Sequence, residues 1–144
     1  MNARAGRLKP GDTFVVRRHV SAHLVRMFGE LIGDLGERHL PAGDRVPIAH
    51  GFYLAAFVSM FAPGMDLVGH RAEFTFHGAA RVGDTVTATV TVRSVRPAGA
   101  FGDWADVGLE YRNQNGELLV EGAIDLLSTP RARPREREAL NDQS

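Results

Sequence analysis

Residues 50–62, HGFYLAAFVSMFA, decide the fold of this chain. The segment is apolar almost all round a helix and ends at residues 63–64, Pro-Gly, so it predicts a helix that is buried on most sides. Its polar exceptions are His50, Tyr53 and Ser59. A helix without a polar face needs a surface that covers it, and the rest of the chain is rich in segments that can provide one.

Four segments after this helix alternate apolar and polar residues, which is the pattern of half-buried strands. The alternation is clearest in TVTATVTV, where valine and alanine alternate with threonine. Asn113-Gln-Asn-Gly116, between the last two segments, predicts a tight hairpin. We therefore expect four consecutive strands in a meander, over residues 68–76, 85–92, 105–111 and 118–126.

Two shorter elements precede the buried helix. TFVVRRH, residues 13–19, follows a Pro-Gly-Asp turn and predicts a strand. Ser21 is a typical helix N-cap, and Gly33 a typical end, so a helix is expected over residues 22–33. One face of it should pack on the core, because it carries a single apolar stripe of Leu24, Val25, Phe28, Leu31 and Ile32.

The order of strand, helix, buried helix and four strands predicts an α+β domain. In this arrangement a five-stranded antiparallel sheet wraps around a long central helix. A length of 144 residues fits one domain. We expect the domain to span residues 11–129, with a flexible N-terminus over 1–10 and a flexible charged tail over 130–144.

The composition limits the classes of function. Seventeen basic residues balance seventeen acidic ones, which argues against binding to nucleic acid or to a membrane surface. The absence of cysteine excludes disulfides, thiolate catalysis and metal sites built on cysteine. Residues 1–11 lack the apolar run of a signal peptide, and no apolar stretch reaches the ~20 residues that span a bilayer, so we expect a cytoplasmic protein.

The loop DLGERHLPAGDRVPIA, residues 34–49, is crowded with titratable groups although it joins two apolar helices. It places Asp34 and His39 five residues apart, and a histidine beside a carboxylate can transfer protons near neutral pH. His50-Gly51 then begins the buried helix, whose first N–H groups are free to bind an oxygen. This combination is typical of a site that stabilises negative charge on a carbonyl oxygen.

These segments resemble the MaoC-like dehydratases and R-specific enoyl-CoA hydratases. The similarity lies in GDLGERH at 33–39, PIAHG at 47–51, RVGDTVTATVTV at 81–92, and Ser59, eight residues after Gly51. The family has the hotdog fold, in which a sheet wraps a central helix. The resemblance covers residues 11–128 and implies a lyase that acts on enoyl or 3-hydroxyacyl thioesters in fatty acid or polyketide metabolism.

The resemblance also implies a role for each site residue. Asp34 and His39 match the catalytic pair, which holds one water that adds across the C2–C3 double bond. Gly51 matches the residue whose N–H binds the thioester oxygen, and Ser59 matches the serine that orients the carboxylate. We expect His50 to belong to these substrate-binding residues as well, because it would brace the start of the helix. No cofactor is implied, and no histidine–carboxylate spacing typical of a metal site occurs.

Two departures from the family signature leave alternatives open. Gly36-Glu37 stands where the family has Asn-Pro, and only ten residues separate His39 from His50, which shortens the segment over the acyl pocket. The same scaffold could therefore add an amine in place of water, or hydrolyse the thioester. A third alternative is a subunit that binds acyl thioesters without turning them over.

The expected partners follow from the same resemblance. The substrate is an acyl thioester of coenzyme A or of an acyl-carrier protein. Sixteen of the seventeen basic residues are arginine, and some could bind the phosphates of either carrier. The family pairs its sheets edge to edge, with the active site near the interface, so a homodimer is expected. Dimerisation would also cover a sheet edge that is exposed in a single chain.

Overall fold

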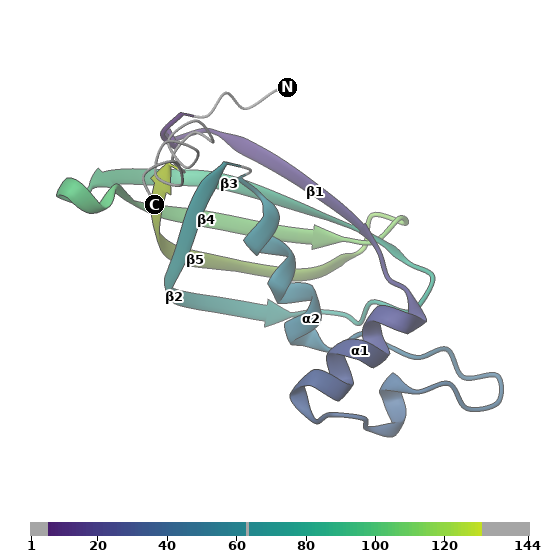
Figure 1. Ribbon diagram of the computed structural model, residues 1–144. Helices are drawn as coiled ribbons and strands as arrows, with labels where there is room; N and C mark the ends of the chain where they lie inside the picture. Colours follow the sequence, from purple (N-terminus) through teal and green to yellow (C-terminus); the bar gives the residue numbers. More distant parts are fainter. Residues whose placement is uncertain (1–5, 63, 131–144) are drawn as a thin grey trace, which may run out of the picture.

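The protein consists mainly of a five-stranded antiparallel sheet that curves around a short helix (Figure 1). The computed structural model describes residues 6–62 and 64–130. The sheet has the order β1-β3-β4-β5-β2. The strands are β1 (Thr13–His19), β2 (Met65–Phe76), β3 (Thr85–Pro97), β4 (Asp103–Arg112) and β5 (Leu118–Pro130). The helices are α1 (Ala22–Ile32) and α2 (Gly51–Ala55), with 3-10 turns η1 (Glu37–His39), η2 (Ala56–Met60) and η3 (Gly99–Phe101).

The predicted alternation of β3 is present in the sheet. Val86, Ala88, Val90 and Val92 are buried, whereas the threonines between them lie on the opposite face. The hairpin between β4 and β5 is confirmed as well. Its turn is closed by Asn113, whose side-chain oxygen accepts hydrogen bonds from the backbone N–H groups of Asn115 and Glu117.

The pairing of β2 differs from the predicted meander. β2 lies at the sheet edge and pairs with β5, so residues 77–84 cross to β3 instead of forming a tight turn. Alternation shows that a strand has one buried face, but it does not identify the neighbouring strand. The meander prediction is therefore right for β3, β4 and β5 and wrong for β2.

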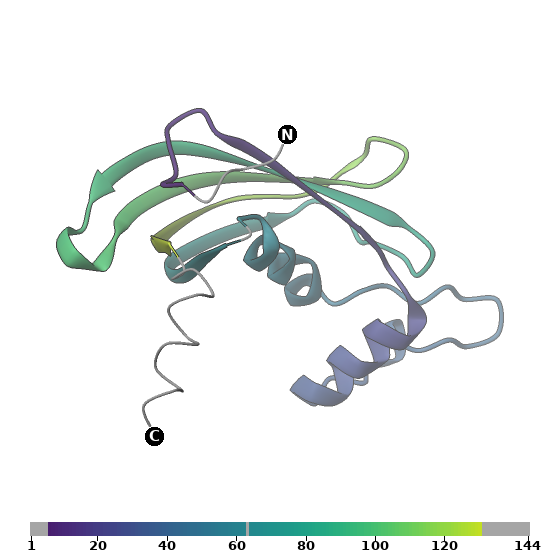
Figure 2. The same cartoon turned by 45° about the horizontal axis from the view of Figure 1, so that its top comes forward.

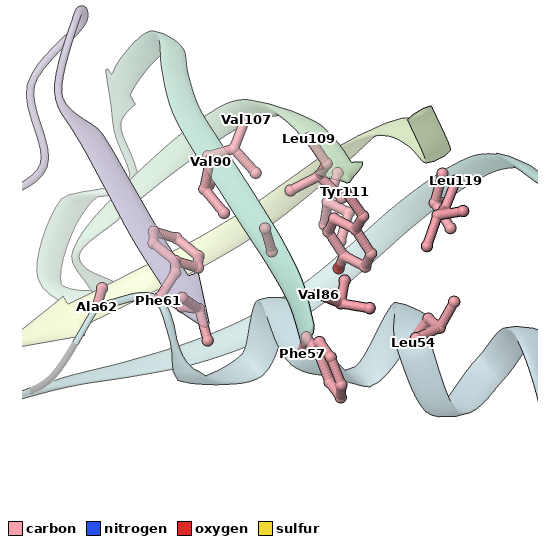
Figure 3. Packing of buried hydrophobic residues seen from close by; sticks show 14 of the residues in the cluster. Leu54, Phe57, Phe61, Ala62, Val86, Val90, Val107, Leu109, Tyr111 and Leu119 are labelled. Atoms are coloured by element: carbon pink, nitrogen blue, oxygen red, sulfur yellow. The ribbon is translucent and has the colours of Figure 1, made fainter. Parts of the chain in front are cut away.

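The central helix is shorter than predicted. α2 has five residues and continues as the 3-10 turn η2. Figure 3 shows Leu54 and Phe57 from this segment beside Tyr111 of β4, in the buried cluster that fills the concave face of the sheet. The opposite face of the segment is open, and Phe52 is 72 % exposed. One sheet can cover only one side of the helix, so burial on most sides is not achieved within one chain.

Helix α1 begins and ends as predicted. The Ser21 side chain accepts a hydrogen bond from the Leu24 N–H, and Gly33 ends the helix in the left-handed conformation, at φ 78°. The expected packing of its apolar stripe is only partly found, because Leu31 is 82 % exposed. In Figure 2, α1 lies away from the sheet, beside the start of α2, and Phe28 contacts His50 there.

The expected flexible termini fall mostly on residues 1–5 and 131–144, which lie outside the described residues. Leu8, from the adjoining segment, is buried in the core. In residues 6–62 and 64–130, no helix has the length and hydrophobicity that crossing a bilayer requires.

Candidate active site

Asp34 is held at the C-terminal end of α1. Its backbone N–H donates to the Gly29 carbonyl at 2.9 Å, as the chain leaves the helix. Its side-chain Oδ1 accepts a hydrogen bond from the Gly36 N–H at 3.1 Å. This local turn leaves Oδ2 available on a half-exposed carboxylate, 3.6 Å from Nε2 of His39.

His39 is oriented by a backbone carbonyl. Its Nδ1 lies 2.7 Å from the Ile48 oxygen. A carbonyl oxygen can only accept, so Nδ1 carries the proton and the neutral ring keeps Nε2 as its basic nitrogen. That nitrogen faces the Asp34 carboxylate, and the side chain is only 16 % exposed. The arrangement presents two proton acceptors side by side at the protein surface.

His50 completes a cluster of three residues. Its side chain is 4 % exposed, and its Nε2 donates to the backbone oxygen of Asp34 at 2.9 Å. The ring stacks on His39 with the centroids 3.6 Å apart. Its Nδ1 is buried and has no hydrogen-bond partner among the described residues. His50 thus touches both Asp34 and His39 from the interior side.

The cluster offers three ligand atoms to a cation, because one atom from each of Asp34, His39 and His50 lies within 4.8 Å of the others. The imidazole planes, however, differ by only 20°. Nitrogen lone pairs in nearly parallel stacked rings do not converge on one ion at the ~2.0–2.1 Å of a zinc–nitrogen bond. The geometry therefore favours proton transfer over metal binding.

Gly51 is the first residue of α2, and the space beside its Cα is filled. A Cβ atom there would lie 2.9 Å from the ring of Phe76. The glycine is therefore needed for the close approach of β2, and Phe76 blocks that side of the backbone. Its N–H has no hydrogen-bond partner among the described residues, so it remains available to an oxygen. Because α2 is so short, a bound oxygen would be stabilised by this donor more than by a helix dipole.

Ser59 lies apart from the cluster. It is exposed on η2 and makes no side-chain hydrogen bond within the described residues. It lines a mostly apolar cavity of about 490 Å³ between the central helix and the strands β2 and β5. Asp34 and His39 do not line this cavity. Within one chain the structure therefore brings together Asp34, His39 and His50, but not Ser59.

Two features of the site carry no signal in the sequence. The Ile48 carbonyl orients His39 through the backbone, which any residue type could do. Tyr53 packs edge-on against Phe28 beside the cluster. Burial raises the pKa of Tyr53, an effect that the nearby charge of Arg18 partly opposes, so the phenol stays protonated at neutral pH.

Comparison with known proteins places this geometry in context. No protein-family model matches the chain. An (R)-specific enoyl-CoA hydratase from Rhodospirillum rubrum is 26 % identical over 133 residues, which cover 83 % of this chain and 88 % of the relative.

Solved structures of similar proteins show what fold this chain shares with them. The (R)-hydratase from A. caviae involved in PHA biosynthesis has a TM-score of 0.71 and 27 % identity, covering 83 % of this chain and 96 % of that protein. A MaoC-like dehydratase from Rhodospirillum rubrum has a TM-score of 0.68 and 20 % identity, covering 88 % and 95 % of the two chains. This chain is therefore a hotdog-fold protein that resembles the (R)-specific enoyl-CoA hydratases and MaoC-like dehydratases.

Proposed function

We propose that this protein is an enoyl-thioester hydratase and 3-hydroxyacyl-thioester dehydratase. The observation that carries the proposal is the pairing of the Asp34 carboxylate with Nε2 of His39 at 3.6 Å. The similarity to two named hydratases, at 26 % and 27 % identity, supports the same reaction. Both directions use the same groups, because the addition of water to an enoyl thioester is reversible.

In the proposed mechanism, Asp34 and His39 bind one water between them. One of the pair accepts a proton from this water as the water oxygen bonds to C3. The electrons of the C2–C3 double bond move toward the thioester oxygen. The pair then donates a proton to C2 of the resulting enolate, which restores its starting protonation state. Each positioned acid or base of this kind contributes about 10²–10⁴ in rate.

The enolate oxygen requires a hydrogen-bond donor. The N–H of Gly51, at the start of α2 and next to His50, has no hydrogen-bond partner among the described residues and is free to act as one. Loss of one such donor in an oxyanion site typically lowers kcat by about 10²–10³. We assign Gly51 to this role.

A homodimer would bring Ser59 into the site. Among residues 6–62 and 64–130 of one chain, Ser59 and the face of the helix that includes Phe52 are exposed. The exposed apolar residues on both α1 and α2 support an interface in this region. We propose that a second copy covers this face and that Ser59 of one protomer orients Asp34 of its partner.

Incubation of the protein with a short enoyl-CoA tests the reaction by mass spectrometry. The proposal expects a product heavier by one water, and loss of that product with Asp34→Asn and with His39→Gln in folded protein. Release of free coenzyme A with the double bond intact would identify a thioesterase. With amino acids present, an adduct heavier by an amine would identify addition of another nucleophile. Binding of the thioester without turnover would indicate a non-catalytic subunit.

A further inference from the structure

A second site lies next to the catalytic pair. Two arginines from the loop over residues 34–49 and a third from residue 81 line one cavity of about 440 Å³. The lining residues are Arg38, Asp44, Arg45, Val46, Ile48 and Arg81. We refer to Arg38, Arg45 and Arg81 as the arginine cluster.

Backbone hydrogen bonds set the positions of the arginine cluster. The N–H of Ile48 donates to the Arg38 carbonyl at 2.9 Å, and Ile48 also forms an antiparallel bridge with Arg81. Arg45 closes a tight turn with Ala42, its N–H donating to that carbonyl at 3.0 Å. These contacts fix the backbone positions of the three arginines, although all three residues are exposed.

The guanidinium groups of the arginine cluster have no ion-pair partner among residues 6–62 and 64–130. The only side-chain hydrogen bond among them joins Arg45 to the backbone oxygen of Glu37 at 3.0 Å, within the described residues. Asp44 is the one acidic group that lines the cavity. Three positive charges against one negative charge make an anion-binding surface in a chain of zero net charge.

Ile48 connects this cavity to the catalytic pair. Its carbonyl oxygen accepts the hydrogen bond from His39, its N–H binds Arg38, and the residue itself lines the cavity. Arg38 also directly precedes His39 in η1. Ile48 therefore lines the cavity and also contacts the imidazole of His39.

We propose that the arginine cluster binds the phosphates of coenzyme A while the acyl thioester reaches Asp34 and His39. This inference rests on the proposed function, since it names the carrier of the same substrate. Guanidinium groups bind phosphate oxygens through paired, charge-assisted hydrogen bonds. Coenzyme A carries a diphosphate and a 3′-phosphate, which match three arginines. The phosphopantetheine of a carrier protein offers a single phosphodiester and would leave most of the cluster unpaired.

Two substrates that carry the same thioester, one with and one without the phosphate-bearing nucleotide, test this. Arg45→Gln and Arg81→Gln are compared with the wild type on crotonyl-CoA and on crotonyl-pantetheine, which keeps the thioester but has no phosphate. Each variant should raise KM for crotonyl-CoA about tenfold, the effect of losing one hydrogen bond to a charged group, with kcat unchanged. On crotonyl-pantetheine both variants should match the wild type. Arg96→Gln, near the far end of β3, is the matched control and should leave both substrates unaffected.

Three results would overturn the inference. Unchanged KM for crotonyl-CoA would show that the arginine cluster does not contact the carrier. Equal losses on both substrates would show that the arginines support the loop and not the phosphates. With crotonyl-carrier protein as a third substrate, a loss on that substrate alone would assign the cluster to the carrier protein instead of coenzyme A.

Calorimetric titration with coenzyme A itself separates this inference from the proposed function, because it needs no turnover. The wild type should bind coenzyme A, and the Arg45→Gln/Arg81→Gln double variant should bind it about a hundredfold more weakly. If no enoyl thioester is hydrated but this difference in coenzyme A affinity persists, the proposed function is wrong and the proposed role of the arginine cluster is retained. If hydration proceeds and the two proteins bind coenzyme A equally, only the proposed role of the arginine cluster is wrong.

Discussion

His50 lies flat against His39, with ring centroids 3.6 Å apart and planes that differ by 20°. The same His50 ring donates through Nε2 to the backbone oxygen of Asp34 at 2.9 Å. One buried side chain therefore contacts both members of the proposed catalytic pair. Because it is almost fully buried, we propose that it positions the other two residues and does not itself contact the substrate.

This positioning predicts a specific kinetic defect. His50→Phe keeps a flat ring against His39 but removes the hydrogen bond to Asp34, whereas His50→Ala removes both. We expect kcat to fall in both variants, more in the alanine variant and by up to about 10²-fold, with KM little changed. Steady-state kinetics on an enoyl thioester measures this.

The pH profile distinguishes positioning from proton transfer. If His50 only positions Asp34 and His39, the profile of kcat/KM keeps its shape in His50→Phe, because both titrating groups remain. Loss of one limb of the profile would mean that His50 itself exchanges a proton during the reaction. An unchanged kcat in His50→Ala would exclude any role for the stacked ring.

Gly51 gives a prediction for stability. In Gly51→Ala, the new Cβ would lie 2.9 Å from the Phe76 ring, so the ring or the strand must shift. Such overpacking costs ~1–3 kcal/mol, and we expect the lower end because Phe76 is partly exposed and can move. Urea unfolding measures the loss. Gly69→Ala is the control, because its Cβ would meet no atom within 4 Å, and a similar loss there would refute the steric explanation.

The local parts of this structure could be predicted from the sequence. Ser21 and Gly33 mark the two ends of α1, and β1 spans the residues that its pattern indicated. Asp34 and His39 lie close together in space, 3.6 Å apart, because they belong to one loop and are only a few residues apart. Where both partners of a contact are close along the chain, the residue types alone limit the geometry.

Non-local relationships could not be predicted in the same way. The pairing of β2 with β5 depends on how α2 carries the chain across the sheet, which alternation does not record. The resemblance implies that Ser59 lies in the same site as Asp34 and Gly51. In the structure the central helix is short, and Ser59 lines a cavity that Asp34 and His39 do not line. The arginine cluster joins two segments, the loop over residues 34–49 and the connection that carries Arg81, through backbone contacts for which side-chain identity gives no signal.

The open helix face predicts an interface. Phe52 on α2 is largely exposed near Ser59, so Phe52→Asp should place a charge in the proposed dimer contact. We expect this variant to sediment as a monomer at micromolar concentration and to lose hydratase activity. Phe101→Asp is the matched control, because Phe101 is exposed to a similar degree on η3. Dissociation by Phe101→Asp and not by Phe52→Asp would place the interface elsewhere.

Tyr111 predicts how stability depends on alkaline pH. Its side chain is fully buried, and its hydroxyl donates to the Ala55 carbonyl at 3.2 Å, which ties β4 to the central helix. Burial raises the pKa of Tyr111 above the ordinary value of 10.0. Above that pH the unfolded chain releases the phenolic proton while the folded protein keeps it. The stabilising effect is therefore complete below pH 10 and is lost as the pH rises further, by about 1.4 kcal/mol per pH unit.

Tyr111→Phe isolates this effect. At pH 7 the variant should be less stable by ~1–3 kcal/mol, because the Ala55 carbonyl loses its buried donor. Above pH 10 the free energy of unfolding of the variant should fall less steeply than that of the wild type, so the two curves converge. Urea denaturation at pH 7 and at several values above pH 10 measures both slopes. Parallel curves throughout that range would mean that Tyr111 ionises in the folded protein as readily as in the unfolded chain.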